Sequence, residues 1–411
     1  MLAVFSALRK RIAPVRTDGR RSTGRSAAPL ARRGVVIAGA VLLLTACEPI
    51  AMGGSGPRID GDGPVRVALL VPGGSGQAGD EAIAQSLENA ARLAVSDLGA
   101  VRIDLRVYNT AGRADQAASQ AVTAVTDGAQ IVLGPVFAES ARAVGAALQG
   151  TGVNVLAFSN NPDVADGNVF ILGPTFDTSA RRLAAHAVAN GKGRILAVHE
   201  RNEAGQLGRA AISSAVAVTG GSLAAAEGFD FSQQGVVEAV PRIADAARAS
   251  GADAIFFTSN TAGALPLLVQ LLPENRTGPD RYQYIGLTRW DIPESILAMP
   301  GVQGAWFALP DPGLMAQFTA RYQAAYGRAP HPIAGLAYDG IAAVGALARS
   351  GRQDALGRAA LTQASGFAGV GGAFRLLPDG TNQRGLAVAQ IRDRQVIVID
   401  PAPRSFAGPG F

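Results

Sequence analysis

The sequence contains one cysteine, three histidines and two lysines among its 411 residues, and these scarcities exclude several kinds of site. The three histidines are dispersed and Cys47 is the single thiol, so the chain has too few ligands for a zinc site and cannot form an intramolecular disulfide. Neither the G-x-S-x-G pattern of serine hydrolases nor the phosphate-binding loop G-x-x-x-x-G-K-[ST] occurs. We therefore predict a protein that is not an enzyme, with no catalytic residues, no metal and no cofactor.

Charged residues make up only 17% of the chain, and the formal net charge of +5 is unevenly distributed. Residues 1–46 contain nine of the 37 basic side chains and one of the 32 acidic ones, so residues 47–411 carry 28 basic and 31 acidic groups, a net charge of −3. A nucleic-acid binder needs clustered lysine and arginine on its folded part to neutralise phosphates. The charge distribution therefore argues against nucleic acid as a partner.

An uncharged apolar run of thirteen residues, 34–46, follows a basic stretch near the start of the chain. A helix needs about 20 apolar residues to span a bilayer, so the run is typical of a signal peptide, here 1–46. It ends in Leu44-Thr45-Ala46-Cys47, which resembles the lipobox of bacterial lipoproteins. That resemblance implies cleavage before Cys47, acylation of Cys47, and a periplasmic protein anchored by lipid to a membrane, the outer one in preference to the inner.

From Val65 onward, short apolar runs alternate with stretches of helical periodicity, which is the pattern of an α/β protein with parallel sheets. Residues 47–64 are rich in glycine and proline and are predicted to form a flexible tether before this part. The first set of predicted strands covers 65–71, 101–107, 131–133 and 153–158, with helices over 80–98, 113–128 and 140–149.

A second set of elements begins after a break near Pro174. Two α/β lobes are therefore implied, and the end of the chain reads as antiparallel. The predicted strands of the second set cover 195–198, 254–257, 284–287 and 305–309, its helices cover 178–190, 206–219, 236–250, 262–272, 318–326 and 333–349, and the antiparallel strands cover 372–376, 385–392 and 395–400.

The segment Gly74 to Gly79 matches the dinucleotide-binding pattern G-x-G-x-x-G between a strand and a helix. The acidic residue expected at the end of the next strand is missing, because that strand closes on Tyr108-Asn109-Thr110. The interpretation favoured here is a tight turn whose backbone N–H groups point at whatever enters a cleft.

Several segments match a known family. The segments 318–327 (FTARYQAAYG) and 337–339 (AYD) are similar to the ending of type I periplasmic binding proteins of the leucine-binding kind, and the resemblance spans 65–400. Within that family, three further segments resemble a narrower branch, the lipoproteins that activate penicillin-binding proteins, which are peptidoglycan synthases. These segments are 133–140, 155–160 and 168–173.

The resemblance implies two Rossmann-like lobes joined by crossing strands. Lobe I would comprise 65–174 and 288–349, lobe II would comprise 175–287 and 350–400, and a tail would cover 401–411. Ligands of open α/β sheets bind outside the carboxyl ends of the strands. The loops at these ends supply the candidate cleft residues Pro72, Ser75, Phe137, Ser159, Asn160, Arg201, Thr258, Trp290 and Asp291.

In amino-acid-binding relatives, a hydroxyl at the place of Ser159 and donors at the start of the helix near Ser140 hold the ligand carboxylate, and an acidic group holds the ammonium. Ser159 fits this pattern and Asp291 is the candidate acid, but Phe137 does not offer the hydroxyl found in those relatives. Phe137 and Trp290 also have a plainer interpretation as packing residues.

Two functions follow from these resemblances. The lipobox and the branch-like segments predict a lipid-anchored regulator whose partner is a penicillin-binding protein. The alternative is a substrate-binding lipoprotein of an ABC importer for amino acids of the branched-chain type, with a small polar ligand between its lobes. An open, polar cleft would favour a solute, and a cleft filled by side chains would favour a protein partner.

Overall fold

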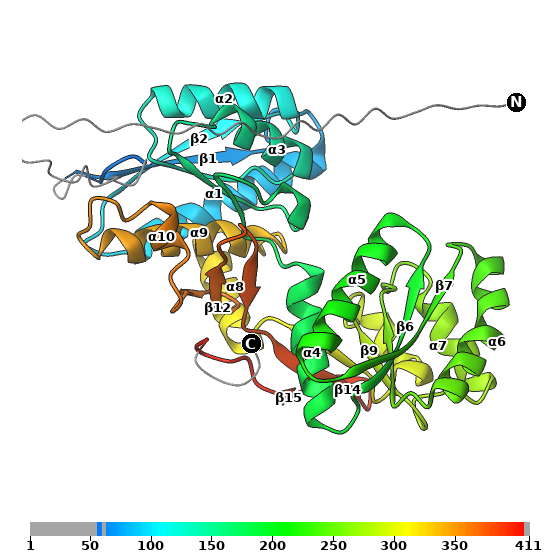
Figure 1. Cartoon of the computed structure of the whole chain (residues 1–411). Helices are drawn as coiled ribbons and strands as arrows, with labels where there is room; N and C mark the ends of the chain where they lie inside the picture. Colours follow the sequence, from blue (N-terminus) through cyan, green and yellow to red (C-terminus); the bar gives the residue numbers. More distant parts are fainter. Residues whose placement is uncertain (1–55, 60–62, 407–411) are drawn as a thin grey trace, which may run out of the picture. The chain divides into compact units, whose positions relative to one another are not determined.

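The computed structural model describes residues 56–59 and 63–406, which form two lobes, each with a largely or wholly parallel sheet (Figure 1). This agrees with the predicted fold class. The predicted signal peptide, Cys47 and most of the predicted tether lie outside the described residues. Within the described residues, no helix is both long enough and apolar enough to cross a membrane.

Lobe I is built on a five-stranded parallel sheet in the order β2-β1-β3-β4-β5. Helices α2 and α3 cover one face through alanine and valine side chains, and α1 and the later helix α9 cover the other (Figure 1). Leu69 and Leu70 of β1 are both fully buried, as expected for a central parallel strand covered on both faces. The elements are β1 (Val65–Val71), α1 (Ala78–Asp97), β2 (Ile103–Asn109), α2 (Ala114–Thr126), β3 (Ile131–Leu133), α3 (Ala138–Ala147), β4 (Asn154–Ala157), η1 (Pro162–Val164) and β5 (Val169–Ile171).

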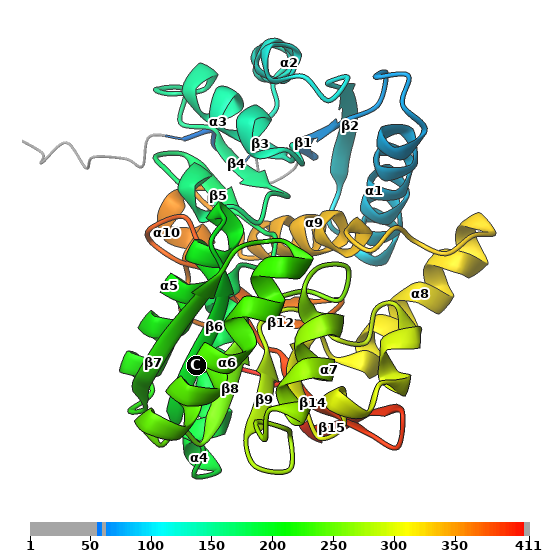
Figure 2. The same ribbon diagram turned by 90° about the vertical axis from the view of Figure 1, so that its right-hand side faces the viewer.

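Lobe II is built on a seven-stranded sheet in the order β15-β14-β10-β9-β8-β6-β7, in which β14 and β15 are antiparallel (Figure 2). Helices α4 and α5 pack on one face, and α6 and α7 pack on the other. The elements are α4 (Phe176–Ala189), β6 (Arg194–Glu200), α5 (Glu203–Val218), β7 (Ser222–Phe229), α6 (Gln233–Ser250), β8 (Ala254–Phe257), α7 (Leu265–Glu274), β9 (Gln283–Gly286), η2 (Glu294–Ala298), η3 (Pro300–Val302), β10 (Trp306–Leu309), β14 (Ala387–Arg392) and β15 (Gln395–Asp400).

The remaining elements return the chain to lobe I, where side chains such as Tyr322 and Phe374 join the core beneath α1 and the sheet. A small antiparallel sheet, β11-β12-β13, lies against α9. These elements are α8 (Pro312–Tyr326), α9 (Ala334–Ala348), α10 (Arg358–Leu361), β11 (Phe367–Gly369), β12 (Gly372–Leu376) and β13 (Asn382–Arg384).

The first boundary between the lobes lies where it was predicted, near residue 174, and the other two differ from the predicted ones. Lobe I was expected to resume at 288, but β10 pairs in parallel with β9 and so belongs to the lobe II sheet. Lobe II was expected to resume at 350, but β11, β12 and β13 pack into the lobe I core. The chain therefore changes lobe near 173–175, near 310–311 and near 385–386. Sheet pairing decides these positions, and it depends on contacts far apart in the sequence.

Two side chains of β13 tie this strand to the first crossing. The Asn382 side-chain amide donates to the carbonyls of Ile171 (2.9 Å) and Gly173 (2.8 Å). The Arg384 guanidinium donates twice to the Leu172 carbonyl, at 3.0 and 2.6 Å, and once to Asp339 at 2.8 Å. The first and third crossings are thus fastened together by side chains as well as by backbone.

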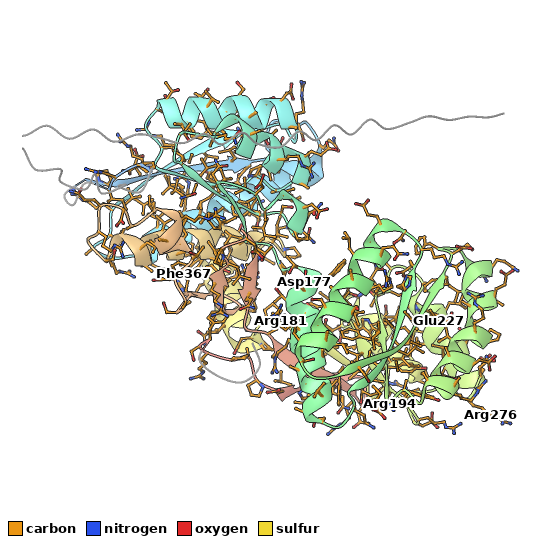
Figure 3. All side chains as sticks on the ribbon, viewed as in Figure 1. Asp177, Arg181, Arg194, Glu227, Arg276 and Phe367 are labelled. Carbon is orange, nitrogen blue, oxygen red and sulfur yellow. The ribbon has the colours of Figure 1, made fainter. Side chains whose placement is uncertain are left out.

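A second polar cluster joins α4 to the end of β15. The Asp400 carboxylate lies 2.8 Å from Arg182 and 3.0 Å from the Nδ1 atom of His186. Arg182 also donates to the Leu386 carbonyl at 2.7 Å, next to the third crossing. Figure 3 shows Asp177 and Arg181 earlier on the same helix, in the part that follows the first crossing. The cluster fixes α4 on the antiparallel edge of lobe II.

We expect Asp400→Asn to lower the melting temperature at pH 7 and to have progressively less effect as the pH falls. Partial burial raises the pKa of Asp400, but hydrogen bonding to His186 and the charge of Arg182 lower it further, so the net pKa lies below that of an ordinary aspartate. A lowered folded-state pKa stabilises the fold above the unfolded pKa of about 3.9, and this contribution is lost as the pH falls through the folded pKa. Melting curves of both proteins between pH 7 and pH 3 test this.

The matched control is Asp245→Asn, which removes an exposed ion pair between Asp245 and Arg248 on α6. Exposed pairs contribute little, so this variant should melt with the wild type at every pH. If the difference in melting temperature between wild type and Asp400→Asn stays constant down to pH 3, the lowered pKa of Asp400 does not contribute to stability.

Candidate ligand-binding site

Five of the predicted cleft residues lie at the carboxyl end of the lobe I sheet, as the strand order requires. Pro72 and Ser75 follow β1, Phe137 follows β3, and Ser159 and Asn160 follow β4. Because β1, β3 and β4 are neighbouring parallel strands, the loops that follow them lie along one edge. We call this set of loops the lobe I half-site.

The glycine-rich turn of this half-site is occupied by the chain itself. The Gly74 N–H donates to the Glu81 carboxylate at 2.7 Å, and the Ser75 hydroxyl accepts from the Gln77 N–H at 3.1 Å. A pyrophosphate bound here would need the Gly74 donor and would meet the Glu81 charge. The turn closes the β1–α1 connection and is unsuited to a dinucleotide.

The start of α3 is the best-placed group of donors in lobe I. Its N-cap residue, Phe137, offers no side-chain hydrogen bond, so the N–H groups of the first turn have no intrahelical partner. Gly134 holds the preceding loop close to β1: its φ is +85°, and an added Cβ would overlap the Leu70 carbonyl. The uncapped turn carries partial positive charge and can receive an anion.

Ser159 is 4% exposed, and its hydroxyl accepts a hydrogen bond from the Asn161 N–H at 3.1 Å. The hydroxyl proton makes no hydrogen bond with the described residues and can be donated to a ligand oxygen. Asn160 is exposed beside it, while the Asn161 side chain caps η1. Ser159 therefore follows the carboxyl end of β4, where it was expected. Its hydroxyl oxygen accepts a hydrogen bond within a local turn, and its hydroxyl proton is available to a ligand.

The carboxyl end of the lobe II sheet holds a buried acid, Glu200, which lies in a segment that the strand-end rule selects (200–202) but is not among the nine candidate residues. Glu200, the last residue of β6, is 6% exposed, and the Thr258 hydroxyl donates to it at 2.8 Å. The Nδ1 atom of His199 lies 3.0 Å from the Glu200 carbonyl. The sequence feature that indicates Glu200 is a carboxylate at the end of a buried apolar strand. The predicted residue Thr258 thus contacts Glu200, and its role in binding a ligand stays a prediction.

The two charged residues predicted for this edge are both paired with neighbours. Asp291 forms a bidentate pair with Arg289, at 2.9 and 2.5 Å. Arg201 contacts Asp230 at 3.3 Å, and both of these side chains are exposed. Glu200 is therefore the better candidate for a ligand ammonium than Asp291, because its described contacts leave its charge without a cationic partner.

The prediction that Trp290 lines the cleft is wrong. Trp290 is 0% exposed, packs with Phe257 at a ring-centroid distance of 5.7 Å, and belongs to the core between the sheet and α6–α7. A Cβ added at Gly286 would overlap its indole, so the ring lies directly on the β9 backbone. Trp290 is a packing residue and offers no surface to a ligand.

Exposed apolar side chains lie in loops of the lobe I half-site and of the lobe II sheet edge that carries Glu200 and Thr258, which we call the lobe II half-site. Phe137 in lobe I is 36% exposed, and Phe231 and Ile292 in lobe II are 63% and 55% exposed. Phe231 and Ile292 flank the loop after β8: the Thr261 hydroxyl donates to the Ile292 carbonyl, and the Phe231 ring approaches Gly263. We call these three residues the apolar rim. Among the described residues, no cluster of three or more His, Cys, Asp or Glu could hold a metal ion.

A family model described as "Periplasmic binding protein" matches residues 64–395, which is most of the chain and both lobes. The chain belongs to the periplasmic binding protein family. This assignment implies a periplasmic location, and it places the chain among binding proteins. No curated protein sequence matches the chain.

Solved structures show the same fold at low sequence identity. The crystal structure of a putative branched-chain amino acid ABC transporter from Rhodospirillum rubrum is 20% identical with a TM-score of 0.69, over 82% of this chain and 100% of that one. A branched-chain amino acid ABC transporter periplasmic ligand-binding protein from Burkholderia xenovorans is 17% identical with a TM-score of 0.64, over 84% and 97%. An ABC transporter substrate-binding protein from Desulfitobacterium hafniense, in complex with Leu, is 16% identical with a TM-score of 0.59, over 82% and 100%. The fold is that of the type I, leucine-binding kind.

Proposed function

We propose that this periplasmic binding protein is the solute receptor of an ABC importer and binds a small molecule that carries a carboxylate and an ammonium group. The structural neighbours named as ABC transporter proteins support this proposal, including the one described in complex with Leu. The observation that carries it is the buried carboxylate of Glu200 at the carboxyl end of the lobe II sheet.

The two half-sites offer complementary chemistry for such a ligand. In lobe I, the open N–H groups at the start of α3 and the Ser159 hydroxyl are donors suited to a carboxylate. In lobe II, Glu200 accepts a hydrogen bond from Thr258 and has oxygen lone pairs left for an ammonium. Hydrogen bonds to charged groups are the stronger ones, so these contacts would carry much of the specificity.

We expect Ser159→Ala to weaken ligand binding about tenfold and Glu200→Gln by about 10- to 100-fold, because a bond to a charged group is worth about 1.5–3 kcal/mol. Isothermal titration with L-leucine, L-isoleucine and L-valine measures both effects. Arg201→Gln is the matched control, since its exposed pair with Asp230 should leave binding within about twofold of wild type. If none of these ligands binds the wild type at 1 mM, the amino-acid assignment is rejected.

We further propose that Cys47 is acylated after removal of 1–46 and that it anchors the protein to the outer membrane in preference to the inner. The lipobox-like run 44–47 supports this proposal. Mass spectrometry of the mature N-terminus should recover a diacylated or triacylated Cys47, and Cys47→Ser should release the protein from the membrane fraction. An unmodified thiol at position 47 would contradict the anchor.

A second candidate function is the regulation of a peptidoglycan synthase, and the apolar rim favours it. Phe137, Phe231 and Ile292 expose apolar surface beside the half-sites, as protein-binding surfaces do. Pull-down of penicillin-binding proteins from solubilised envelopes should weaken strongly in the double variant Phe231→Ala/Ile292→Ala. Val218→Ala, which removes an equally exposed side chain from the far end of α5, should not affect it. If wild type, the double variant and Val218→Ala all recover the same amount of penicillin-binding protein, this second function is rejected.

A further inference from the structure

A cavity of about 1020 Å³ lies in lobe I at the end of the sheet opposite the half-site. It is lined by Asn154 and Val169, the first residues of β4 and β5, whereas Ser159 and the other half-site residues follow the strands' carboxyl ends. Its volume is at the upper end of the roughly 300–1,000 Å³ found for small-molecule pockets and exceeds what a single amino acid needs. The cavity is therefore separate from the proposed solute site.

Four segments that are distant in the sequence form its walls. They are 56–58 near the start of the described chain, 142–154 from the second half of α3 to the start of β4, 163–169 from η1 to β5, and 353–359 before and into α10. Figure 2 shows where α3, β4, β5 and α10 lie. The first segment is held in place by the Gln130 side chain, which donates to the Arg58 carbonyl at 2.6 Å, and by Ile59, which donates to the Gln353 carbonyl at 2.9 Å. The walls are therefore fixed by internal hydrogen bonds.

The lining suits the groups of a peptide backbone. Six glycines and four residues with amide side chains line it. Part of this polar set is used internally, since the Asn154 and Asn168 side chains donate to the carbonyls of Leu356 and Val153, and the remaining amide groups are available to a ligand. Leu148, Val164 and Val169 give it an apolar floor. The glycines are 56, 145, 150, 152, 167 and 357, and the amide residues are Gln149, Asn154, Asn168 and Gln353.

The charged lining residues divide into paired and unpaired groups. Arg358 donates to the carbonyls of Gly167 and Pro378, and Asp354 pairs with Arg352 at 2.9 Å. In contrast, the side chains of Arg58, Arg142, Asp163 and Asp166 have no hydrogen bond or ion pair with the described residues. The two carboxylates stand on one segment around η1, and the two guanidinium groups stand on other walls.

This arrangement selects a ligand with both charges. A simple anion would meet Asp163 and Asp166, and a simple cation would meet Arg58 and Arg142, so either would be repelled by part of the cavity. A molecule with a carboxylate at one end, an ammonium at the other and amides between them satisfies both pairs. We propose that this cavity binds a short peptide with free amino and carboxyl ends, its carboxylate on Arg58 and Arg142 and its ammonium on Asp163 and Asp166.

The test uses the mature protein and tetra-L-alanine with free ends, titrated by isothermal calorimetry. We expect a Kd below about 1 mM, the weak end of specific binding. The doubly blocked peptide, N-acetylated and C-amidated, should bind at least about tenfold more weakly, as should Arg142→Gln and Asp163→Asn, since each change removes a charged contact. If the blocked peptide binds saturably and as tightly as the free peptide, the proposal is overturned. The charged ends would then contribute nothing, and an internal segment of a protein could occupy the cavity equally well.

A matched pair of variants on α3 locates the binding. Ala146 is exposed and lines the cavity, so Ala146→Trp should obstruct part of it and weaken binding at least about tenfold. Ala147 is exposed on the same helix but does not line the cavity. Ala147→Trp should therefore bind as wild type does. Equal loss in both variants, or no heat from the wild type at 5 mM peptide, would overturn the proposal. Glu200→Gln should leave this binding unchanged, so the cavity and the solute site are tested independently.

Discussion

Asp339→Ala is expected to lower the free energy of unfolding by about 3–5 kcal/mol, the usual cost of removing one partner from a buried ion pair. Asp339 is 1% exposed, accepts from Arg384 at 2.8 Å and from the Val370 N–H at 2.8 Å, and so joins α9 to β11 and β13. Without it, Arg384 keeps a buried charge held only by the Leu172 carbonyl and the face of the Phe374 ring. Urea denaturation measures the loss.

A double variant distinguishes an orphaned charge from lost packing. Replacing both partners with apolar residues of similar size, Asp339→Leu with Arg384→Met, removes the uncompensated charge and should recover part of the stability lost in Asp339→Ala. The control Asp97→Ala removes a more exposed carboxylate that pairs with Arg321, and should cost about 1 kcal/mol or less. A loss below 1 kcal/mol in Asp339→Ala would show that the pair does not hold the crossing strands.

The sequence pattern located both buried and partly exposed strands, and it missed others. The partly exposed strand β15 was located to the residue, whereas the fully buried strand β5 was not predicted. β1 and β3 were located to the residue because their runs are almost wholly apolar, interrupted only by Arg66 in β1. The edge strand β7 was missed: its sequence, SLAAAEGF, has no β-branched residue, and its burial comes from β6 on one side only. Alanine favours helix, so local propensity pointed away from the strand that pairing with β6 creates.

The second and third crossings between the lobes were also hidden from local patterns. The stretch 385–392 was predicted as one strand, but the chain leaves the small lobe I sheet at Arg384 and enters the lobe II sheet at Ala387. What decides this is long-range: Arg384 bonds the Leu172 carbonyl, and Ala387 pairs with Leu309. Neither partner can be identified from periodicity.

For the candidate site, the rule that ligands lie at the carboxyl ends of parallel strands placed Ser159 and Thr258 correctly at the two edges. The rule could not separate surface from core within a loop. The candidate list therefore took the buried Trp290, and from the segment 200–202 it took Arg201 instead of Glu200. The cavity at the opposite end of lobe I carries no local signal, because its walls come from four separate segments.

Trp290→Ala is expected to lower the free energy of unfolding by about 3–5 kcal/mol while leaving the solute site chemically intact. The indole is fully buried against Phe257 and the β9 backbone, so its removal leaves a cavity in the lobe II core. Its Nε1 atom has no hydrogen-bond partner among the described residues, so the loss is one of packing. Trp290→Phe, which keeps most of the volume, should cost less than half as much, and both variants should be compared by urea denaturation and by ligand titration.

A double-mutant cycle between Trp290 and Gly286, the glycine beneath its ring, tests whether the two residues are in contact. Gly286→Ala alone should be strongly destabilising, because the new Cβ would overlap the indole and force the ring to move. In the Trp290→Ala background the same methyl group enters vacated space, so the two losses should not add, and the double variant should be more stable than their sum predicts. Additive losses would show that the ring and β9 are not in contact, and a large drop in ligand affinity for Trp290→Phe at unchanged stability would return Trp290 to the binding site.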